Sequence, residues 1–158
     1  MTGTPATLVL TRAGVAFTEH GYAADAADAA VPYGEQAARQ LGVDPRRVFK
    51  TLLVEVDRRL VVAIVPVACQ LALKRLAAAV GGKRAEMAAP AVAERATGYV
   101  VGGISPLGQR RRLQTVLDVS ARSLPTVYVS GGRRGLQLEL EPDDLIELTG
   151  ATVAPVSR

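Results

Sequence analysis

The stretch "FKTLLVEVDRRLVVAIVPV" (residues 49–67) sets the fold class, because two apolar, β-branched runs lie on either side of Asp57-Arg58. Two runs of this kind joined by a tight turn are typical of a β-hairpin. Helix signals surround the hairpin. Thr4-Pro5 combines a capping threonine with a proline at the first helical position, and Gly14 can end that helix. The chain is therefore expected to mix strands with helices.

The remaining elements follow from apolar periodicity and from helix-cap signals. Helices are expected at 4–14, 34–42, 70–82, 90–98 and 141–150, with one more helical turn from Asp44-Pro45. Strands are expected at 16–22, 99–101, 112–120, 126–130 and 136–140, with extended pieces at 83–87 and 152–156 and a loop at 23–33. Several strands are joined by short loops, which fits a doubly wound βαβ sheet poorly. The sequence predicts an α+β fold: a single domain, residues 1–158, with a mixed, barrel-like curved β-sheet flanked by helices.

One cysteine (Cys69) and one histidine (His20) among 158 residues narrow the kinds of site that the chain can hold. They exclude a disulfide framework and argue against a structural zinc site, so no metal and no cofactor are expected. No apolar run is long enough to cross a bilayer, and the N-terminal residues lack the features of a signal peptide. The protein is therefore expected in the cytoplasm, without a membrane partner.

Positive charge gathers in short clusters. Nineteen Lys and Arg against fifteen Asp and Glu give a net charge of only +4. The clusters are Arg46–Arg47, Arg110–Arg112 and Arg133–Arg134. Clustered cations bind phosphates locally even where the net charge is mild. The sequence leaves open whether each cluster contacts nucleic acid or is ordinary solvated surface.

Lys50 stands out because the chain has only two other lysines, Lys74 and Lys83, and uses arginine elsewhere. It lies at the start of an expected apolar strand. Lysine is a compact charge that can lose its proton when desolvated, which arginine cannot do. The alternative is a strand-end lysine whose ammonium group lies in solvent.

Two glycine-containing loops resemble each other: "GGISPLG" (102–108) and "SGGRRG" (130–135). Glycine lets backbone approach a ligand closely and offer its N–H groups. The first loop is neither a Walker A motif nor a GxSxG nucleophile turn, and a Ser105 nucleophile would need His20 as its base. With Lys50 beside them, the loops predict a pocket for an anionic ligand. Two ordinary turns with charged tips remain the alternative.

Three motifs in fixed order carry a resemblance to a known family: "FKTL" (49–52), "TGYVVGGISPLGQ" (97–109) and "YVSGGRRGL" (128–136). With them the chain resembles, over nearly its whole length, the YbaK/EbsC family of free-standing trans-editing proteins. That family is related to the editing domain of bacterial prolyl-tRNA synthetase. The resemblance implies the family's fold, a mixed-strand, barrel-like sheet flanked by helices.

The resemblance also implies roles for particular residues. The catalytic set is Lys50 with the backbone of Gly102 and Gly103. The substrate-binding set is Tyr22, Tyr33, Thr51, Ile104, Ser105, Ser130 and Gly131, and the tRNA-binding set is Arg110, Arg111, Arg112, Arg133 and Arg134. The chain departs from the family pattern at two positions. Ala24 stands where some members have histidine, and Gln137 stands where some have aspartate.

The function that the resemblance implies is deacylation of mischarged Cys-tRNA(Pro), with Cys-tRNA(Cys) as a further substrate. The substrate thiol would attack its own ester, releasing a thiolactone and free tRNA. This route explains why the sequence has no evident nucleophile–base pair. The alternatives are an Ala-tRNA(Pro) deacylase that uses water, and a non-catalytic module that binds tRNA or a synthetase. The expected partners are tRNA(Pro) and prolyl-tRNA synthetase, and not DNA.

Overall fold

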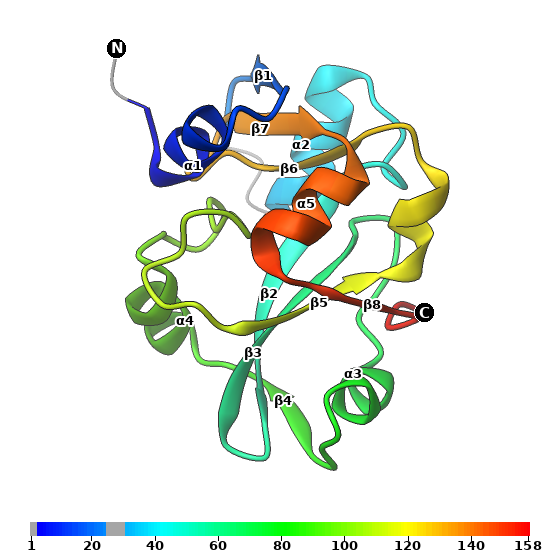
Figure 1. Cartoon of the computed structure of the whole chain (residues 1–158). Helices are drawn as coiled ribbons and strands as arrows, with labels where there is room; N and C mark the ends of the chain where they lie inside the picture. The colour runs from blue at the N-terminus through cyan, green and yellow to red at the C-terminus, as the bar shows by residue number, and fades with distance from the viewer. Residues whose placement is uncertain (1–2, 25–30) are drawn as a thin grey trace.

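The computed structural model describes residues 3–24 and 31–158, and its strands form two sheets (Figure 1). The larger sheet has the order β4 (Ala85–Met87), β2 (Phe49–Val56), β3 (Arg59–Pro66), β5 (Gln114–Asp118) and β8 (Thr152–Ala154). The smaller has the order β1 (Thr18–Gly21), β7 (Leu136–Leu140) and β6 (Val127–Ser130). The expected α+β class is confirmed, although the strands divide between two sheets instead of closing into one.

The β2–β3 hairpin forms where the sequence predicts it. Asp57 and Arg58 both have positive φ, 49° and 69°, as the tight two-residue hairpin turn requires. The Asp57 carboxylate also accepts hydrogen bonds of 3.0 Å from the backbone N–H groups of Lys83 and Arg84. These bonds, the one from Arg84 first, hold the pKa of Asp57 below its usual value. The turn residue therefore also fixes the chain that enters β4.

The larger sheet is mixed because its two halves are connected differently. β2 pairs antiparallel with β3 and β4, whereas β5 pairs parallel with both β3 and β8. A parallel pair needs a long crossover connection, and here the chain passes through α3 (Leu73–Ala79), β4 and α4 (Pro90–Thr97) between β3 and β5. This crossover brings α4 beside β2, where the cavity described below lies.

The larger sheet is buried on both faces, so β2 and β3 are apolar with little alternation. One face joins the smaller sheet, α1 (Pro5–Ala13) and α5 (Pro142–Thr149) in a core that includes Leu10, Ile64, Leu138 and Leu145. The other face packs against α3 through Leu76. Figure 1 shows α3 and α5 well separated from each other, as expected for helices that pack in different cores.

The helix ends follow the predicted caps. Thr4 Oγ1 accepts a hydrogen bond from the Thr7 N–H at the start of α1. Gly14, Gly42 and Gly98 are left-handed at the ends of α1, α2 (Tyr33–Leu41) and α4. Glycine adopts this conformation without the steric cost that other residues pay. No helix in residues 3–24 and 31–158 is long and apolar enough to cross a bilayer.

The strand expected at 99–101 is wrong: these residues form a bend and a turn that lead into the loop at 102–108, which we call the glycine loop. Burial raises the pKa of Tyr99 to about 12, and its hydroxyl donates a 2.6 Å hydrogen bond to the Leu107 carbonyl. The Val101 N–H donates to the Glu94 carboxylate at 2.8 Å. The Tyr99 N–H likewise donates to Thr97 Oγ1, so side chains take the place of a neighbouring strand as acceptors for these two N–H groups.

Three other expected elements are shorter than predicted or of another type. The strand expected at 112–120 ends at Asp118, whose carboxylate accepts from the Ser120 N–H and starts a 3₁₀ helix, η2 (Val119–Ser123). The helix expected at 70–82 begins only at Leu73, because Gln70 and Ala72 bond to the C-terminal segment. Asp44-Pro45 forms a turn and no helix. Of the loop expected at 23–33, residues 25–30 lie outside the described part of the chain.

Candidate active site

A cavity of about 330 Å³ opens between β2, the start of α2, α4 and the glycine loop. It is mostly apolar. Its lining consists of Pro32, Tyr33, Gly34, Phe49, Lys50, Thr51, Leu52, Leu53, Met87, Ala88, Pro90, Ala93, Val101, Gly102, Ile104, Ser130 and Gln137. The three motifs of the sequence thus meet at one place. A small organic group surrounded by apolar side chains fits such a site, with a few polar groups to orient it.

Lys50 is the one positively charged side chain among the described lining residues. It lies near the start of β2, opposite Val65 of β3, and is half-buried. Its ammonium group makes no ion pair and no side-chain hydrogen bond with any other described residue. The described lining also contains no carboxylate, imidazole or thiol. An unpaired cation in apolar surroundings attracts an anionic or strongly polarised oxygen of a ligand.

Two buried side-chain oxygens in the lining have no hydrogen-bond partner among the described residues: Thr51 Oγ1 and Gln137 Oε1. Leaving one such group unsatisfied costs about 1–3 kcal/mol, so native structures rarely contain them without a reason. Ser130 differs, because its Oγ accepts a 3.2 Å hydrogen bond from the Gly132 N–H. Thr51 and Gln137 therefore provide the polar positions still available to a ligand.

The glycine loop is tightly fitted at the cavity edge. Gly102 has φ +92°, and a Cβ atom there would lie 2.7 Å from the Tyr33 ring and from Arg134 Nε. A Cβ on Gly103 would lie 2.8 Å from Arg133 Cα. The Gly103 N–H already donates to the Val100 carbonyl at 2.9 Å, which closes a turn. Among the cavity-lining residues of this loop, the N–H groups of Gly102 and Ile104 have no hydrogen-bond partner in the described chain and remain for a ligand.

Three residues of the expected substrate-binding set lie outside the described lining. Ser105 is fully buried, and its Oγ accepts a 3.2 Å hydrogen bond from the Leu107 N–H. Gly131 is buried and donates its N–H to the Leu136 carbonyl. Tyr22 is half-buried and donates its N–H to the Gly135 carbonyl. Tyr33, Thr51, Ile104 and Ser130 do line the cavity.

We expect Ser105→Ala to retain, within about two-fold, the deacylation activity that the resemblance implies, because the hydroxyl is used inside its own turn. The free energy of unfolding should fall by about 1 kcal/mol, since the Leu107 N–H loses its acceptor. Urea unfolding and a deacylation assay measure the two effects. A loss of activity of about a thousand-fold at unchanged stability would instead identify Ser105 as a nucleophile.

The arginines expected to bind tRNA differ in their surroundings. Arg110, Arg111, Arg112 and Arg133 are exposed, and their side chains make no hydrogen bond or ion pair with other described residues. Arg134 is exposed as well, but its side chain has partners: its guanidinium lies 4.4 Å from the centroid of the Tyr33 ring and donates to the Val101 carbonyl. Within the cluster at 133–134, the Arg134 side chain therefore has partners in the protein, whereas the Arg133 side chain has none among the described residues.

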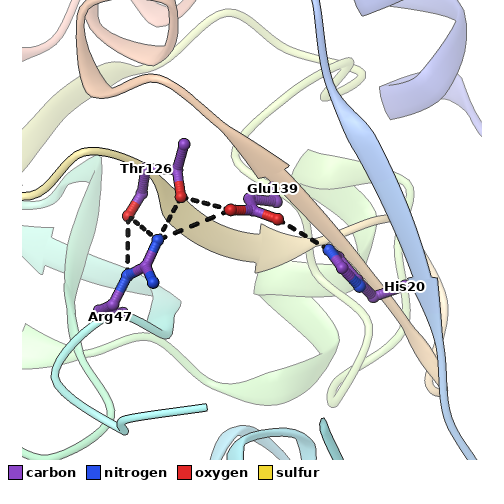
Figure 2. Close-up of polar contacts among 4 residues, drawn as sticks. All are labelled: His20, Arg47, Thr126 and Glu139. Carbon is purple, nitrogen blue, oxygen red and sulfur yellow. Dashed lines mark hydrogen bonds and ion pairs between the residues drawn. The ribbon is translucent and has the colours of Figure 1, made fainter.

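A polar network of His20, Arg47, Thr126 and Glu139 at the smaller sheet was not predicted from the sequence (Figure 2). Glu139 lies 2.9 Å from His20 Nε2 through one oxygen, and accepts from the Thr126 hydroxyl through the other. Arg47 donates to the Thr126 carbonyl and hydroxyl. The hydrogen bonds from Thr126 first, and then from His20, lower the pKa of Glu139. Gln137 precedes Glu139 by two residues on β7, so both side chains lie on the same face of the sheet.

Comparison with known proteins identifies the family. The sequence profile of the "Aminoacyl-tRNA editing domain" matches residues 29–148. The chain is 38% identical over 124 residues, 78% of its length and 76% of the relative's, to "Putative Cys-tRNA(Pro)/Cys-tRNA(Cys) deacylase EbsC" of Enterococcus faecalis (strain ATCC 700802 / V583). It is 30% identical over 119 residues, 75% of its length and 76% of the relative's, to "Uncharacterized protein YwhH" of Bacillus subtilis (strain 168).

Solved structures share the fold. "Hypothetical protein APE2540" superposes with a TM-score of 0.86 at 27% identity, over 98% of this chain and 100% of that one. A protein described as "a putative trans-editing enzyme for prolyl tRNA synthetase" superposes with a TM-score of 0.81 at 24% identity, over 100% and 99%. The second likeness concerns the fold alone. Taken with the profile match and the relatives, the chain belongs to the aminoacyl-tRNA editing domain family, which confirms the resemblance drawn from its motifs.

Proposed function

We propose that this protein is a trans-acting aminoacyl-tRNA deacylase that removes cysteine from Cys-tRNA(Pro) and Cys-tRNA(Cys). The observation that carries the proposal is the composition of the cavity. Its size suits a small aminoacyl group, it offers one unpaired cation, Lys50, and its described lining holds no nucleophile–base pair. The name of the relative from E. faecalis supports the substrate class.

A cysteinyl ester supplies the nucleophile that the lining lacks. The substrate sulfur attacks the carbonyl carbon of its own ester, so that a C–S bond forms and the C–O bond to the ribose breaks. The thiol proton passes to the departing ribose oxygen, and the products are a thiolactone and tRNA with a free terminal hydroxyl. Water then opens the thiolactone to cysteine. The protein needs only to hold sulfur and carbonyl in attack geometry, which can supply a large part of the rate acceleration.

Two groups stabilise the negative charge that develops in this reaction. The Lys50 ammonium, in mostly apolar surroundings, attracts the negatively charged oxygen. The Gly102 N–H, held at the cavity edge, is a second donor. Thr51 Oγ1 and Gln137 Oε1, which lack partners among the described residues, accept hydrogen bonds from the α-ammonium group of the substrate. In this proposal, Lys50 and Gly102 stabilise the developing charge, and Thr51 and Gln137 orient the substrate.

The exposed arginines Arg110–Arg112 and Arg133 contact the tRNA backbone in this proposal, which is why the net charge is locally concentrated. The protein acts in the cytoplasm, and prolyl-tRNA synthetase is its expected partner for selecting tRNA(Pro). Adding the synthetase to the assay should raise the rate on Cys-tRNA(Pro) more than on Cys-tRNA(Cys). Equal stimulation of both would remove the synthetase from the proposal.

The deciding experiment compares radiolabelled cysteinyl, alanyl, prolyl and 2-aminobutyryl esters of tRNA(Pro). We expect rapid loss of the cysteinyl ester, with a thiolactone trapped as the first product, and slow loss of the isosteric 2-aminobutyryl ester, which lacks sulfur. Loss of the alanyl or 2-aminobutyryl ester as fast as loss of the cysteinyl ester would identify a deacylase that uses water. Salt-sensitive tRNA binding without ester loss above the buffer control would identify a non-catalytic binding module.

A further inference from the structure

The backbone of Val101 is held from two sides by oppositely charged side chains. Its N–H donates to Glu94 Oε2 at 2.8 Å, and its carbonyl accepts from Arg134 Nε at 3.1 Å and Nη2 at 2.8 Å. Glu94 comes from α4, and Arg134 comes from the loop between β6 and β7. Hydrogen bonds to charged groups are about twice as strong as neutral ones. The residue that precedes the glycine loop is thus tied to two separate elements.

Arg134 is itself fixed by Tyr33, the first residue of α2. The guanidinium carbon lies 4.4 Å from the centroid of the Tyr33 ring, so the flat cation stacks while two of its N–H groups reach one carbonyl. Only a planar guanidinium can make both contacts together, and lysine cannot replace it. The contact brings α2, the glycine loop and the β6–β7 loop together at the cavity edge.

Apolar packing does little to hold the residues just before the loop. The side chains of Val100 and Val101 are 57% and 37% exposed, although the neighbouring Tyr99 is buried. Residues 99–101 do not form the strand expected from the sequence, so no sheet hydrogen bonds constrain them either. The hydrogen bonds of the Val101 backbone to Glu94 and Arg134 are therefore the principal restraint on Val101, and Val101 directly precedes Gly102. Gly102, with φ +92°, has no room for a side chain between Tyr33 and Arg134.

We propose that Arg134 and Glu94 are positioning residues that clamp Val101 and thereby hold the Gly102 N–H over the cavity. Both arginines are exposed, but Arg134 then acts through the loop, whereas Arg133, whose side chain has no partner among the described residues, is available to a phosphate. This refines the tRNA-binding set, because the two adjacent arginines have different tasks. The kinetic consequences rest on the proposed function. The structural consequence, an ordered loop, does not.

The clamp and a phosphate contact make opposite predictions for charge-conserving substitutions. A phosphate contact needs a cation, so Arg134→Lys would retain most of the activity, and Arg134→Ala would reduce the salt slope of tRNA binding by about one. The clamp needs the flat fork, so Arg134→Lys should be nearly as impaired as Arg134→Ala, and the salt slope should not change. Glu94→Gln keeps an acceptor oxygen for the Val101 N–H and should rescue most of what Glu94→Ala loses.

Hydrogen exchange measures the clamp without reference to activity. In Arg134→Lys, Arg134→Ala and Glu94→Ala, amide exchange in residues 100–104 should speed up at least about ten-fold, while the melting temperature changes by only a few degrees. The matched control is Arg122→Lys, an exposed arginine in η2 away from the cavity, whose loop exchange should equal that of the unmodified protein. Unchanged loop exchange in Arg134→Ala overturns the proposal, whatever the enzyme assay gives.

Kinetics then separate positioning from tRNA contact. We expect Arg134→Lys to lower kcat about ten-fold at nearly unchanged KM, on Cys-tRNA(Pro) and equally on a cysteinyl ester of adenosine, which has no tRNA body. A defect seen only with full tRNA would assign Arg134 to the phosphate backbone and contradict the clamp. If the unmodified protein deacylates neither substrate, the proposed function fails, and the exchange experiment still decides the clamp.

Discussion

Replacing Lys50 by methionine should lower kcat/KM for Cys-tRNA(Pro) deacylation by about 10²–10³-fold. Lys50 is the one cation in the described lining of a mostly apolar cavity, where a charge interacts more strongly with a developing oxyanion than it would in water. Methionine keeps an unbranched side chain as far as the ε position and removes the ammonium group with its charge. Single-turnover rates on radiolabelled Cys-tRNA(Pro) give the effect on the chemical step.

Two further variants make the Lys50 result interpretable. Lys50→Arg should recover only part of the activity, because a planar guanidinium does not place its charge where a compact ammonium does. Lys74→Met is the matched control: Lys74 is exposed on α3, outside the described cavity lining, and its loss should leave the rate unchanged. If Lys50→Met is folded, as its melting temperature would report, and still deacylates within about two-fold, Lys50 has no catalytic role.

Replacing Asp118 by alanine should lower the free energy of unfolding by about 3 kcal/mol at pH 7. Its carboxylate, 2% exposed, accepts from the Ser120 N–H and hydroxyl at 3.3 and 2.6 Å, and from the Val156 and Ser157 N–H groups at 3.0 Å each. It therefore joins the end of β5 to the C-terminal segment that follows β8. Alanine leaves three backbone N–H groups without their acceptor. Urea unfolding measures the loss.

The pH dependence follows from the pKa of the same carboxyl group. Burial alone would raise the pKa of Asp118, but the hydrogen bonds from Ser120, Val156 and Ser157 outweigh it, so the pKa lies below the usual 3.8. A lowered folded-state pKa gives stability that is present above the unfolded-state pKa and is lost as the pH falls through the folded value. The stability difference between the unmodified protein and Asp118→Ala should therefore narrow below about pH 4.

The control for Asp118 is Asp143→Asn, which changes an exposed aspartate in the first turn of α5. Its cost should stay below about 1 kcal/mol, since only a screened interaction with the helix dipole is lost. A cost for Asp118→Ala no larger than that of Asp143→Asn, at pH 7, would show that the buried hydrogen bonds contribute little. A difference that is constant between pH 7 and pH 3 would contradict the lowered pKa.

Local patterns in the sequence were enough to predict the hairpin, the helix caps and the family. The Asp57-Arg58 turn, the Thr4 cap and the closing glycines depend on residues within one turn of each other, so short stretches specify them. Lys50 was found because lysine is rare in this chain. The two glycine-containing loops suggested a pocket beside Lys50, but the sequence alone could not exclude that both loops are ordinary turns with charged tips.

Tertiary structure alone decided which groups of the site remain free to bind. The sequence places Arg133 and Arg134 side by side, yet only Arg134 stacks on Tyr33 and bonds to Val101, which lie far from it along the chain. The Gly103 N–H is used within its own turn, the Ser105 hydroxyl is buried, and Gln137 Oε1 has no partner among the described residues. Residue type and spacing fix the chemistry that a side chain can perform. Whether its donors and acceptors are already used depends on contacts between distant segments, which no local pattern encodes.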